Sequence, residues 1–218
     1  MALKIHKLVL GLFNTNCYVL VDEQTREAIV IDPPDNAPVI LDVLKRENWT
    51  LREILVTHAH FDHVLALGDL KAATGAPYRL HKADLPQLEM LPQIAEMLIG
   101  REVPLPPMPD SFVDEGDTIT VGSIRLDVLS TPGHTPGHVS YVAREQAVVF
   151  SGDCLFAGSV GRTDLPGGDY PTLMRSICDK LLPLGDGYTV AAGHMESTSI
   201  GRERTSNPFL LDWMDAPG

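Results

Sequence analysis

The chain has 218 residues, of which 44% are hydrophobic and 21% are charged, as in ordinary globular proteins. The formal net charge of −12 argues against a nucleic-acid-binding surface, and no apolar run is long enough for a transmembrane span. The N-terminus carries no signal-peptide pattern, and three scattered cysteines are too few for a disulfide framework. We therefore expect a cytoplasmic protein without nucleic acid or membrane as a partner.

The first half of the chain alternates short apolar runs with segments of helical spacing. Runs rich in Val, Ile and Leu predict strands at 3–13, 17–22, 27–32, 51–56 and 77–81. Apolar spacing predicts helices over 37–48, directly after Asp62, and over 83–100. We interpret the last helix, which contains methionines, as core, with a flap or a subunit contact as the alternative.

The second half repeats this mixed pattern. It predicts strands at 111–114, 118–121, 124–130, 139–143, 147–151 and 187–191. Helices are expected at 171–182 and near 198–206, the latter stopped by Asn207-Pro208. Two such halves predict an α/β protein with two mixed sheets packed face to face and helices outside. Because no linker divides the chain, we expect a single domain over 1–218.

A dense group of metal-binding side chains follows the predicted strand 51–56. Three imidazoles and a carboxylate fall within six residues, at His58, His60, Asp62 and His63. Imidazole nitrogen and carboxylate oxygen are common donors to zinc, iron and manganese. A solvated His-rich turn would gain nothing from this density, so the segment indicates a metal site.

Three later residues that follow predicted strands complete the candidate donor set. A lone histidine at a strand end is more often structural, but the opening cluster still needs partners. One set of donors is then His58, His60 and His134, the other is Asp62, His63 and His194, and Asp153 bridges the two. The counts fit two divalent ions that share a water.

Two neighbours of these donors need a separate interpretation. His138 is surplus, and we favour a supporting or structural role over its replacing His134 as a ligand. Cys154 adjoins Asp153, but successive strand residues face opposite ways, so its thiol is expected in the core rather than in catalysis. His6 and His81 are isolated and are expected to be structural.

The combined motifs resemble the metallo-β-lactamase superfamily over nearly the whole chain. They are His-x-His-x-Asp-His at 58–63, Pro-Gly-His-Thr-Pro-Gly-His at 132–138, Ser-Gly-Asp at 151–153 and Gly-His at 193–194. The resemblance implies an αββα four-layer sandwich with a dinuclear site. Its metal ligands carry over onto His58, His60, Asp62, His63, His134, Asp153 and His194.

Two further segments resemble one group within that superfamily. Gly161-Arg162-Thr163-Asp164 and Glu203-Arg204-Thr205-Ser206-Asn207-Pro208 are similar to the short, single-domain hydroxyacylglutathione hydrolases, or glyoxalase II enzymes. The resemblance implies hydrolysis of a glutathione thioester such as S-lactoylglutathione, by a hydroxide that bridges two divalent ions. It also implies that no separate C-terminal glutathione-binding domain is present.

The expected ions are Zn²⁺, with iron or manganese as alternatives, because mixed His/Asp sites accept all three. Asp62 is the candidate catalytic residue, since it can orient the hydroxide as well as bind a metal. Arg162 is a candidate contact for an anionic substrate tail, with a surface salt bridge as an equal alternative. A thiolate leaves readily, so no dedicated general acid is expected.

Other functions stay open at this point. An iron-dependent glutathione persulfide dioxygenase would hold one iron with His58, His134 and Asp153. A hydrolase of another ester or lactone would use the dinuclear site unchanged. A β-lactamase is less favoured because Asp153 is typical of the hydrolases, and a non-enzymatic binding module would not need both donor sets. A small-molecule substrate is expected, and a homo-oligomer is left open.

Overall fold

The computed structural model describes residues 3–215 and divides the chain into two compact units. The first unit runs to Val113 and includes Ile119–Arg125. The second unit consists of Asp114–Thr118 and the residues from Leu126 onward.

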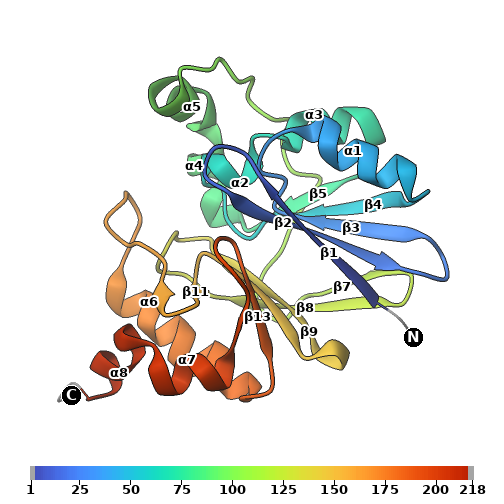
Figure 1. The fold of residues 1–218 in the computed structure, drawn as a ribbon. Helices are drawn as coiled ribbons and strands as arrows, with labels where there is room; N and C mark the ends of the chain where they lie inside the picture. The colour runs from blue at the N-terminus through green and yellow to red at the C-terminus, as the bar shows by residue number, and fades with distance from the viewer. Residues whose placement is uncertain (1–2, 216–218) are drawn as a thin grey trace. The chain divides into compact units, whose positions relative to one another are not determined.

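A six-stranded mixed sheet forms the centre of the first unit (Figure 1). Its order follows the chain, and its strands are β1 (Leu3–Leu10), β2 (Thr15–Asp22), β3 (Glu27–Ile31), β4 (Thr50–Leu55), β5 (Tyr78–Leu80) and β6 (Ser111–Phe112). The pairs β1–β2 and β2–β3 are antiparallel, whereas the pairs from β3 to β6 are parallel. The carboxyl ends of β3 and β4 therefore meet at one edge of the sheet.

Two helices cover one face of this sheet (Figure 1). They are α1 (Ala37–Arg46) and α3 (Leu67–Thr74), and the short α2 (Phe61–Val64) precedes α3. Ile40 of α1 and Leu70 of α3 are fully buried in one cluster with Val30 and Ile54 of the sheet. The apolar spacing that predicts α1 is thus used to bury its inner face.

The predicted helix over 83–100 is interrupted. The structure has a 3₁₀ turn η1 (Lys82–Asp84) followed by α4 (Leu85–Glu89) and α5 (Leu91–Ile99). Pro92 lies in the first turn of α5, where its missing N–H costs no helical hydrogen bond, so the chain restarts a helix there. Leu91 and Ala95 join the core as expected, while Met97 is 74% exposed.

A second six-stranded mixed sheet has the order β14-β13-β10-β9-β8-β7. Its strands are β7 (Thr118–Val121), β8 (Ile124–Ser130), β9 (Val139–Ala143), β10 (Val148–Gly152), β13 (Thr189–Ala192) and β14 (Thr198–Ser199). β10 and β13 are parallel neighbours, so the residues that follow them meet at one edge. A separate two-stranded hairpin joins β11 (Leu155–Phe156) to β12 (Ser159–Val160).

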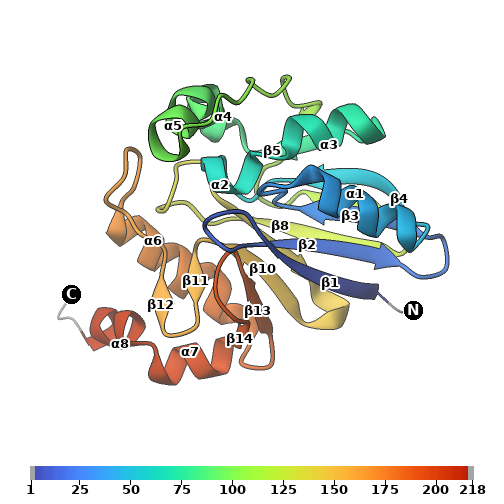
Figure 2. The same cartoon turned by 45° about the horizontal axis from the view of Figure 1, so that its top comes forward.

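The helices of the second unit pack on its sheet (Figure 2). They are α6 (Tyr170–Ser176), the π turn η3 (Ile177–Leu181), η4 (Leu182–Leu184), α7 (Ile200–Ser206) and α8 (Pro208–Asp215). The 3₁₀ turn η2 (Arg144–Gln146), between β9 and β10, has no buried residue. Leu173 of α6 and Ile200 of α7 are fully buried with Val149 and Val190 of the sheet. Pro208, which the sequence marks only as a stop, also begins α8, because proline suits the first turn of a helix.

The α/β class and the two mixed sheets with helices are confirmed. The face-to-face packing of the sheets and the single domain over 1–218 stay predictions. Within residues 3–215, no helix has both the length and the apolar character needed to cross a membrane.

Asp22, at the end of β2, gives the first unit a pH-dependent contribution to stability. Its carboxylate accepts hydrogen bonds from the backbone N–H groups of Gln24, Thr25 and Ser123, at 2.8, 3.2 and 2.7 Å. These donors, Ser123 first, hold the pKa of Asp22 at about 2. The folded state therefore favours the charged form more than the unfolded chain does.

We predict that Asp22→Asn lowers the melting temperature at pH 7. The difference in melting temperature should shrink as the pH falls from about 4 toward 2. In this range the Asp22 carboxylate of the wild type becomes protonated and loses the stabilisation of its charged form. Thermal unfolding followed by circular dichroism at several pH values measures both effects. Asp42→Asn, at a side chain that is 72% exposed on α1, is the control. A deficit that is constant over this pH range would contradict the prediction.

Candidate metal centre

The histidine cluster of the first unit lies between β4 and α2. The ring centroid of His58 is 4.8 Å from that of His60 and 4.1 Å from that of His63. Asp62 lies in the first turn of α2, with its Oδ2 atom 3.8 Å from Nε2 of His63. His58 and His63 are buried, whereas His60 and Asp62 are partly exposed. The structure thus brings together the four ligands predicted in this segment.

A buried aspartate at the end of the neighbouring strand supports this cluster. Asp32 follows β3, which is parallel to β4, and its side chain is 2% exposed. One carboxylate oxygen accepts the backbone N–H of Thr57 at 2.7 Å. The other accepts the hydroxyl of Thr57 at 2.7 Å and lies 3.1 Å from Nδ1 of His63. Asp32 therefore holds both Thr57 and His63 by hydrogen bonds.

These contacts determine the tautomers of two histidines. A carboxylate only accepts, so His63 donates its Nδ1–H to Asp32. The Thr57 hydroxyl donates its proton to Asp32, so at 3.0 Å it accepts the Nδ1–H of His58. In both rings Nε2 is then the atom with a lone pair for a metal, which is the usual arrangement of a histidine ligand.

Two more side chains hold the cluster from other elements. Asp84 of η1 is fully buried and accepts the backbone N–H of Ala59 at 2.9 Å. Thr15, at the start of β2, donates its hydroxyl to Oδ2 of Asp62 at 3.1 Å. Asp32, Asp84 and Thr15 are members of the site that the sequence did not predict. The available signal was an acid directly after a strand that runs parallel to the one delivering the cluster.

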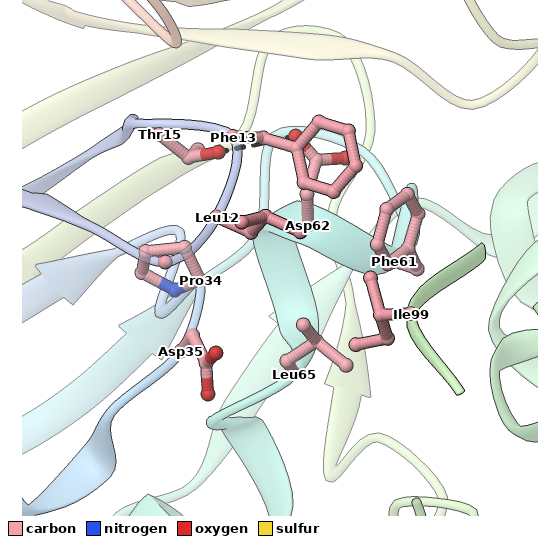
Figure 3. A pocket seen from close by; sticks show the side chains of 10 residues that line it. Leu12, Phe13, Thr15, Pro34, Asp35, Phe61, Asp62, Leu65 and Ile99 are labelled. Carbon is pink, nitrogen blue, oxygen red and sulfur yellow. Dashed lines mark hydrogen bonds between the residues drawn. The ribbon is translucent and has the colours of Figure 1, made fainter. Parts of the chain in front are cut away.

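A small pocket opens beside Asp62 within the first unit (Figure 3). The rings of Phe13 and Phe61 meet edge to face at 5.1 Å between centroids. The lining comprises Gly11, Leu12, Phe13, Thr15, Pro34, Asp35, Phe61, Asp62, Leu65 and Ile99. Figure 3 shows Ile99 between Phe61 and Leu65, with the Phe13 ring on the other side of Phe61. An apolar wall therefore adjoins a predicted metal ligand.

The second unit contains the other three predicted ligands, with two histidines beside the carboxylate of Asp153. Oδ2 of Asp153 lies 3.7 Å from Nε2 of His134 and 3.4 Å from Nε2 of His194. Asp153 and His194 follow the parallel neighbours β10 and β13 closely, which explains why they meet. His134 comes from the loop after β8. A carboxylate between two imidazoles has the donor arrangement expected for a bridging ligand.

Hydrogen bonds also hold two of these three residues, the side chain of His134 and the backbone of Asp153. His134 donates its Nδ1–H to the backbone carbonyl of Arg162 at 2.7 Å, which turns Nε2 toward Asp153. The backbone N–H of Asp153 donates to Nε2 of the fully buried His138 at 3.1 Å. Nδ1 of His138 then carries the proton and donates to Thr131 at 2.9 Å. His138 therefore has the supporting contact that the sequence analysis favoured.

Glycine is required at two positions around this group. A Cβ atom on Gly161 would lie 1.8 Å from the carbonyl oxygen of Asp153 and 3.2 Å from Nδ1 of His134. Gly133 has a φ of 126°, and a Cβ there would lie 2.2 Å from the backbone nitrogen of Leu173. Both glycines allow a close backbone approach next to a predicted ligand.

The structure gives other residues from the sequence analysis clear surroundings. The Arg162 side chain is 60% exposed and forms a bidentate ion pair with Asp164, which keeps the pKa of Asp164 at about 2. A substrate contact for Arg162 stays a prediction. Cys154 is fully buried in the core, where burial raises the pKa of its thiol. Nδ1 of His81 accepts the N–H of Ala83, and His6 packs edge-on against Trp49, so both have structural contacts.

The donors suit divalent metal ions. Nδ1 contacts a protein group in His58, His63 and His134. Nε2 lies within 4 Å of a carboxylate oxygen in His63, His134 and His194. Neutral imidazoles with carboxylates are the donors that zinc, iron and manganese take up. The sharing of ions between the two sets of donors stays a prediction.

Comparison with known proteins places this chain in a family. Residues 10–194 match the Metallo-beta-lactamase superfamily. The chain is 38% identical to the hydroxyacylglutathione hydrolase GloC of Haemophilus influenzae, over 91% of this chain and 93% of that protein. The crystal structure of the B3 metallo-beta-lactamase BLEG-1 has a TM-score of 0.87 at 40% identity, covering 95% of this chain and 99% of that one.

A third similar protein was crystallised with metal. The structure of TTHA1623 in a di-iron-bound form has a TM-score of 0.85 at 39% identity, covering 94% of this chain and all of the other. The match in fold, over nearly full lengths on both sides, agrees with the two mixed sheets and with the clustered His and Asp donors. The chain therefore belongs to the metallo-β-lactamase superfamily, a group of metal-dependent hydrolases with an α/β sandwich fold.

Proposed function

We propose that this protein hydrolyses thioesters, most readily an S-(2-hydroxyacyl)glutathione such as S-lactoylglutathione, with two divalent ions. The observation that carries the proposal is the shared orientation of His58 and His63 by Asp32, which prepares donors of both predicted ligand sets. The similarity to GloC, a hydroxyacylglutathione hydrolase, supports the substrate class.

The residues proposed to hold the ions are the seven predicted ligands. His58, His60 and His134 would bind one ion, Asp62, His63 and His194 the other, and Asp153 both. Bound divalent ions lower the pKa of a water ligand toward neutrality and polarise a carbonyl oxygen. Zn²⁺ is our first choice, and the di-iron form of the related TTHA1623 makes iron a second choice.

The side chains around these donors would orient the attacking water and contact the substrate. Asp62, whose carboxylate accepts the Thr15 hydroxyl at 3.1 Å, would orient the attacking water as well as bind a metal. A thiolate is a weakly basic leaving group, because a thiol has a pKa of about 8.5, so the thiol side of the substrate can leave without a proton donor. The pocket beside Asp62 has a volume of only about 10 Å³, enough for one water, so its apolar wall is proposed as a surface against which the acyl substituent packs. A cytoplasmic location fits a glutathione thioester and is part of the proposal.

Two other functions stand as alternatives. The 40% identity to a B3 metallo-beta-lactamase supports β-lactam hydrolysis as one alternative, so a β-lactam is included among the substrates to be tested. The glutathione persulfide dioxygenase would need one iron and oxygen, so metal content and oxygen uptake separate it from the thioesterase.

We predict that the metal-analysed protein carries two equivalents of metal and hydrolyses acyl-glutathione thioesters without oxygen uptake. The panel contains S-lactoylglutathione, an acetyl thioester, a lactone, a β-lactam and glutathione persulfide. Asp153→Ala should abolish turnover and lower the metal content while the far-UV circular dichroism stays native-like. One iron with oxygen uptake on persulfide, or full activity in Asp153→Ala, would overturn the proposal.

We predict that Asp32→Asn weakens metal binding by roughly 10- to 100-fold, the usual effect of losing a carboxylate behind a histidine ligand. Asparagine is nearly isosteric and tolerates the left-handed backbone of Asp32, at φ 52°. The loss should therefore come from His58 and His63 rather than from the fold. Competition with a chromophoric chelator measures the affinity. Unchanged affinity would show that Asp32 does not prepare the two ligands.

We predict that Ile99→Ala shifts acyl specificity toward longer chains. Removing this part of the wall beside Asp62 makes room for additional methylene groups, each worth about 1–3 kcal/mol in a fitting pocket. The ratio of kcat/KM for hexanoyl- over lactoylglutathione should rise by about tenfold. Leu98→Ala is the matched control, because Leu98 lies next in the same helix, is 52% exposed and does not line the pocket. An equal change in both variants would place the acyl group elsewhere.

A further inference from the structure

A buried carboxylate in α7 lies outside the metal centre and has a specific set of donors. Glu203 is fully buried. One carboxylate oxygen accepts the hydroxyl of Thr198 at 2.6 Å. The other accepts the backbone N–H of Gly158 at 2.8 Å and Nδ2 of Asn207 at 2.9 Å. A carboxylate is expensive to bury, so three donors at these distances indicate a position that must be held accurately.

Asn207 extends this group of contacts. It is also fully buried, and its Nδ2 donates to the backbone carbonyl of Ser159 at 3.0 Å. Its Oδ1 accepts the N–H of Phe209 at the start of α8. Gly158 lies in the turn of the β11–β12 hairpin, and Ser159 is the first residue of β12. Glu203 thus binds the N–H of the turn residue Gly158, and Asn207 binds the carbonyl of Ser159, which follows it.

The hairpin leads directly into the metal centre at both ends. Asp153 lies two residues before β11, and Gly161 and Arg162 follow β12. Gly161 donates its N–H to the carbonyl of Cys154 and packs against the carbonyl of Asp153. The carbonyl of Arg162 accepts the Nδ1–H of His134. A shift of the hairpin would therefore move the backbone of one predicted ligand and the hydrogen-bond partner of another.

We propose that Glu203 and Asn207 are positioning residues for the metal centre. By fixing the turn of the β11–β12 hairpin they fix Asp153 and the Arg162 carbonyl, and through that carbonyl the tautomer and direction of His134. The inference rests on the proposed ligand roles of His134 and Asp153, not on the identity of the substrate. It assigns a purpose to the buried residues of the segment Glu203–Pro208.

The competing view is that these residues only join α7 to the hairpin and stabilise the unit. Arg204 gives a matched comparison on the same helix. It donates to the Asp186 carboxylate at 2.8 Å and to the carbonyl of Leu182 at 2.7 Å, away from the hairpin. Arg204→Ala should lower the melting temperature without changing metal binding. A structural role for Glu203 would produce the same pattern.

The test measures metal affinity and stability in the full chain for Glu203→Ala, Asn207→Ala, Glu203→Gln and Arg204→Ala. Chelator competition gives the affinity, and the visible spectrum of the Co²⁺-substituted protein reports the ligand geometry. Glu203→Ala and Asn207→Ala should lose roughly 10- to 100-fold in affinity and alter the Co²⁺ spectrum. Glu203→Gln should restore most of the affinity, because its amide can accept from Gly158 and donate to Thr198.

Each outcome decides the inference. Equal metal affinity and an unchanged Co²⁺ spectrum in Asn207→Ala and Glu203→Gln, with only a lower melting temperature, would overturn it, even if Glu203→Ala does not fold. Reduced affinity in Arg204→Ala to the same degree would also overturn it, since stability alone would then explain the loss. Because the readout is metal binding, wild-type protein that binds two ions but cleaves no thioester would refute the proposed function and leave this inference standing.

Discussion

The carboxylate of Asp32 is the constraint on which the first half of the metal centre depends. It is buried and accepts from the backbone and the hydroxyl of Thr57 and from His63, so its charge is stabilised by hydrogen bonds. Removing any one donor would leave a buried charge less well solvated, which couples the three groups into one unit. The same hydrogen bonds fix Nδ1 of His58 and His63 as proton donors. Fold and donor orientation are thus determined by the same contacts.

The second half reaches the same result with different chemistry. Here the acceptor behind His134 is a backbone carbonyl, and Asp153 is held through its own N–H by His138. Backbone groups move only with their chain segment, so the accuracy of this half depends on how firmly its loops are held. Glycine at 161 permits the close contact between the loop and Asp153, and no other residue would fit there without a shift. A carboxylate orients one half of the centre, whereas packing of loops orients the other.

Much of this protein could be predicted from its sequence, for identifiable reasons. Strand and helix periodicity located the elements of both sheets, and the residue types at strand ends identified the side chains that cluster in each unit. The break between α4 and α5 and the start of α8 were missed because Pro92 and Pro208 can begin a helix as well as end one. Asp32 and Glu203 were missed because their donors lie on other elements, as with Thr57 twenty-five residues from Asp32. Such partners become apparent only when register and neighbouring strands are known.

The supporting contacts also bear on the choice between one ion and two. A mononuclear iron site would use His58, His134 and Asp153 and leave Asp62 and His63 without a role in the chemistry. Yet His63 contacts the buried Asp32 carboxylate directly, whereas His58 reaches it through Thr57. Asp62 in turn accepts the hydroxyl of the buried Thr15. Ordering side chains and burying polar groups costs free energy, so hydrogen bonds that orient a side chain favour a use for it. Asp62 and His63 are each oriented by a hydrogen bond from or to a buried side chain, as His58 is. This equal support favours a centre in which both donor sets bind metal.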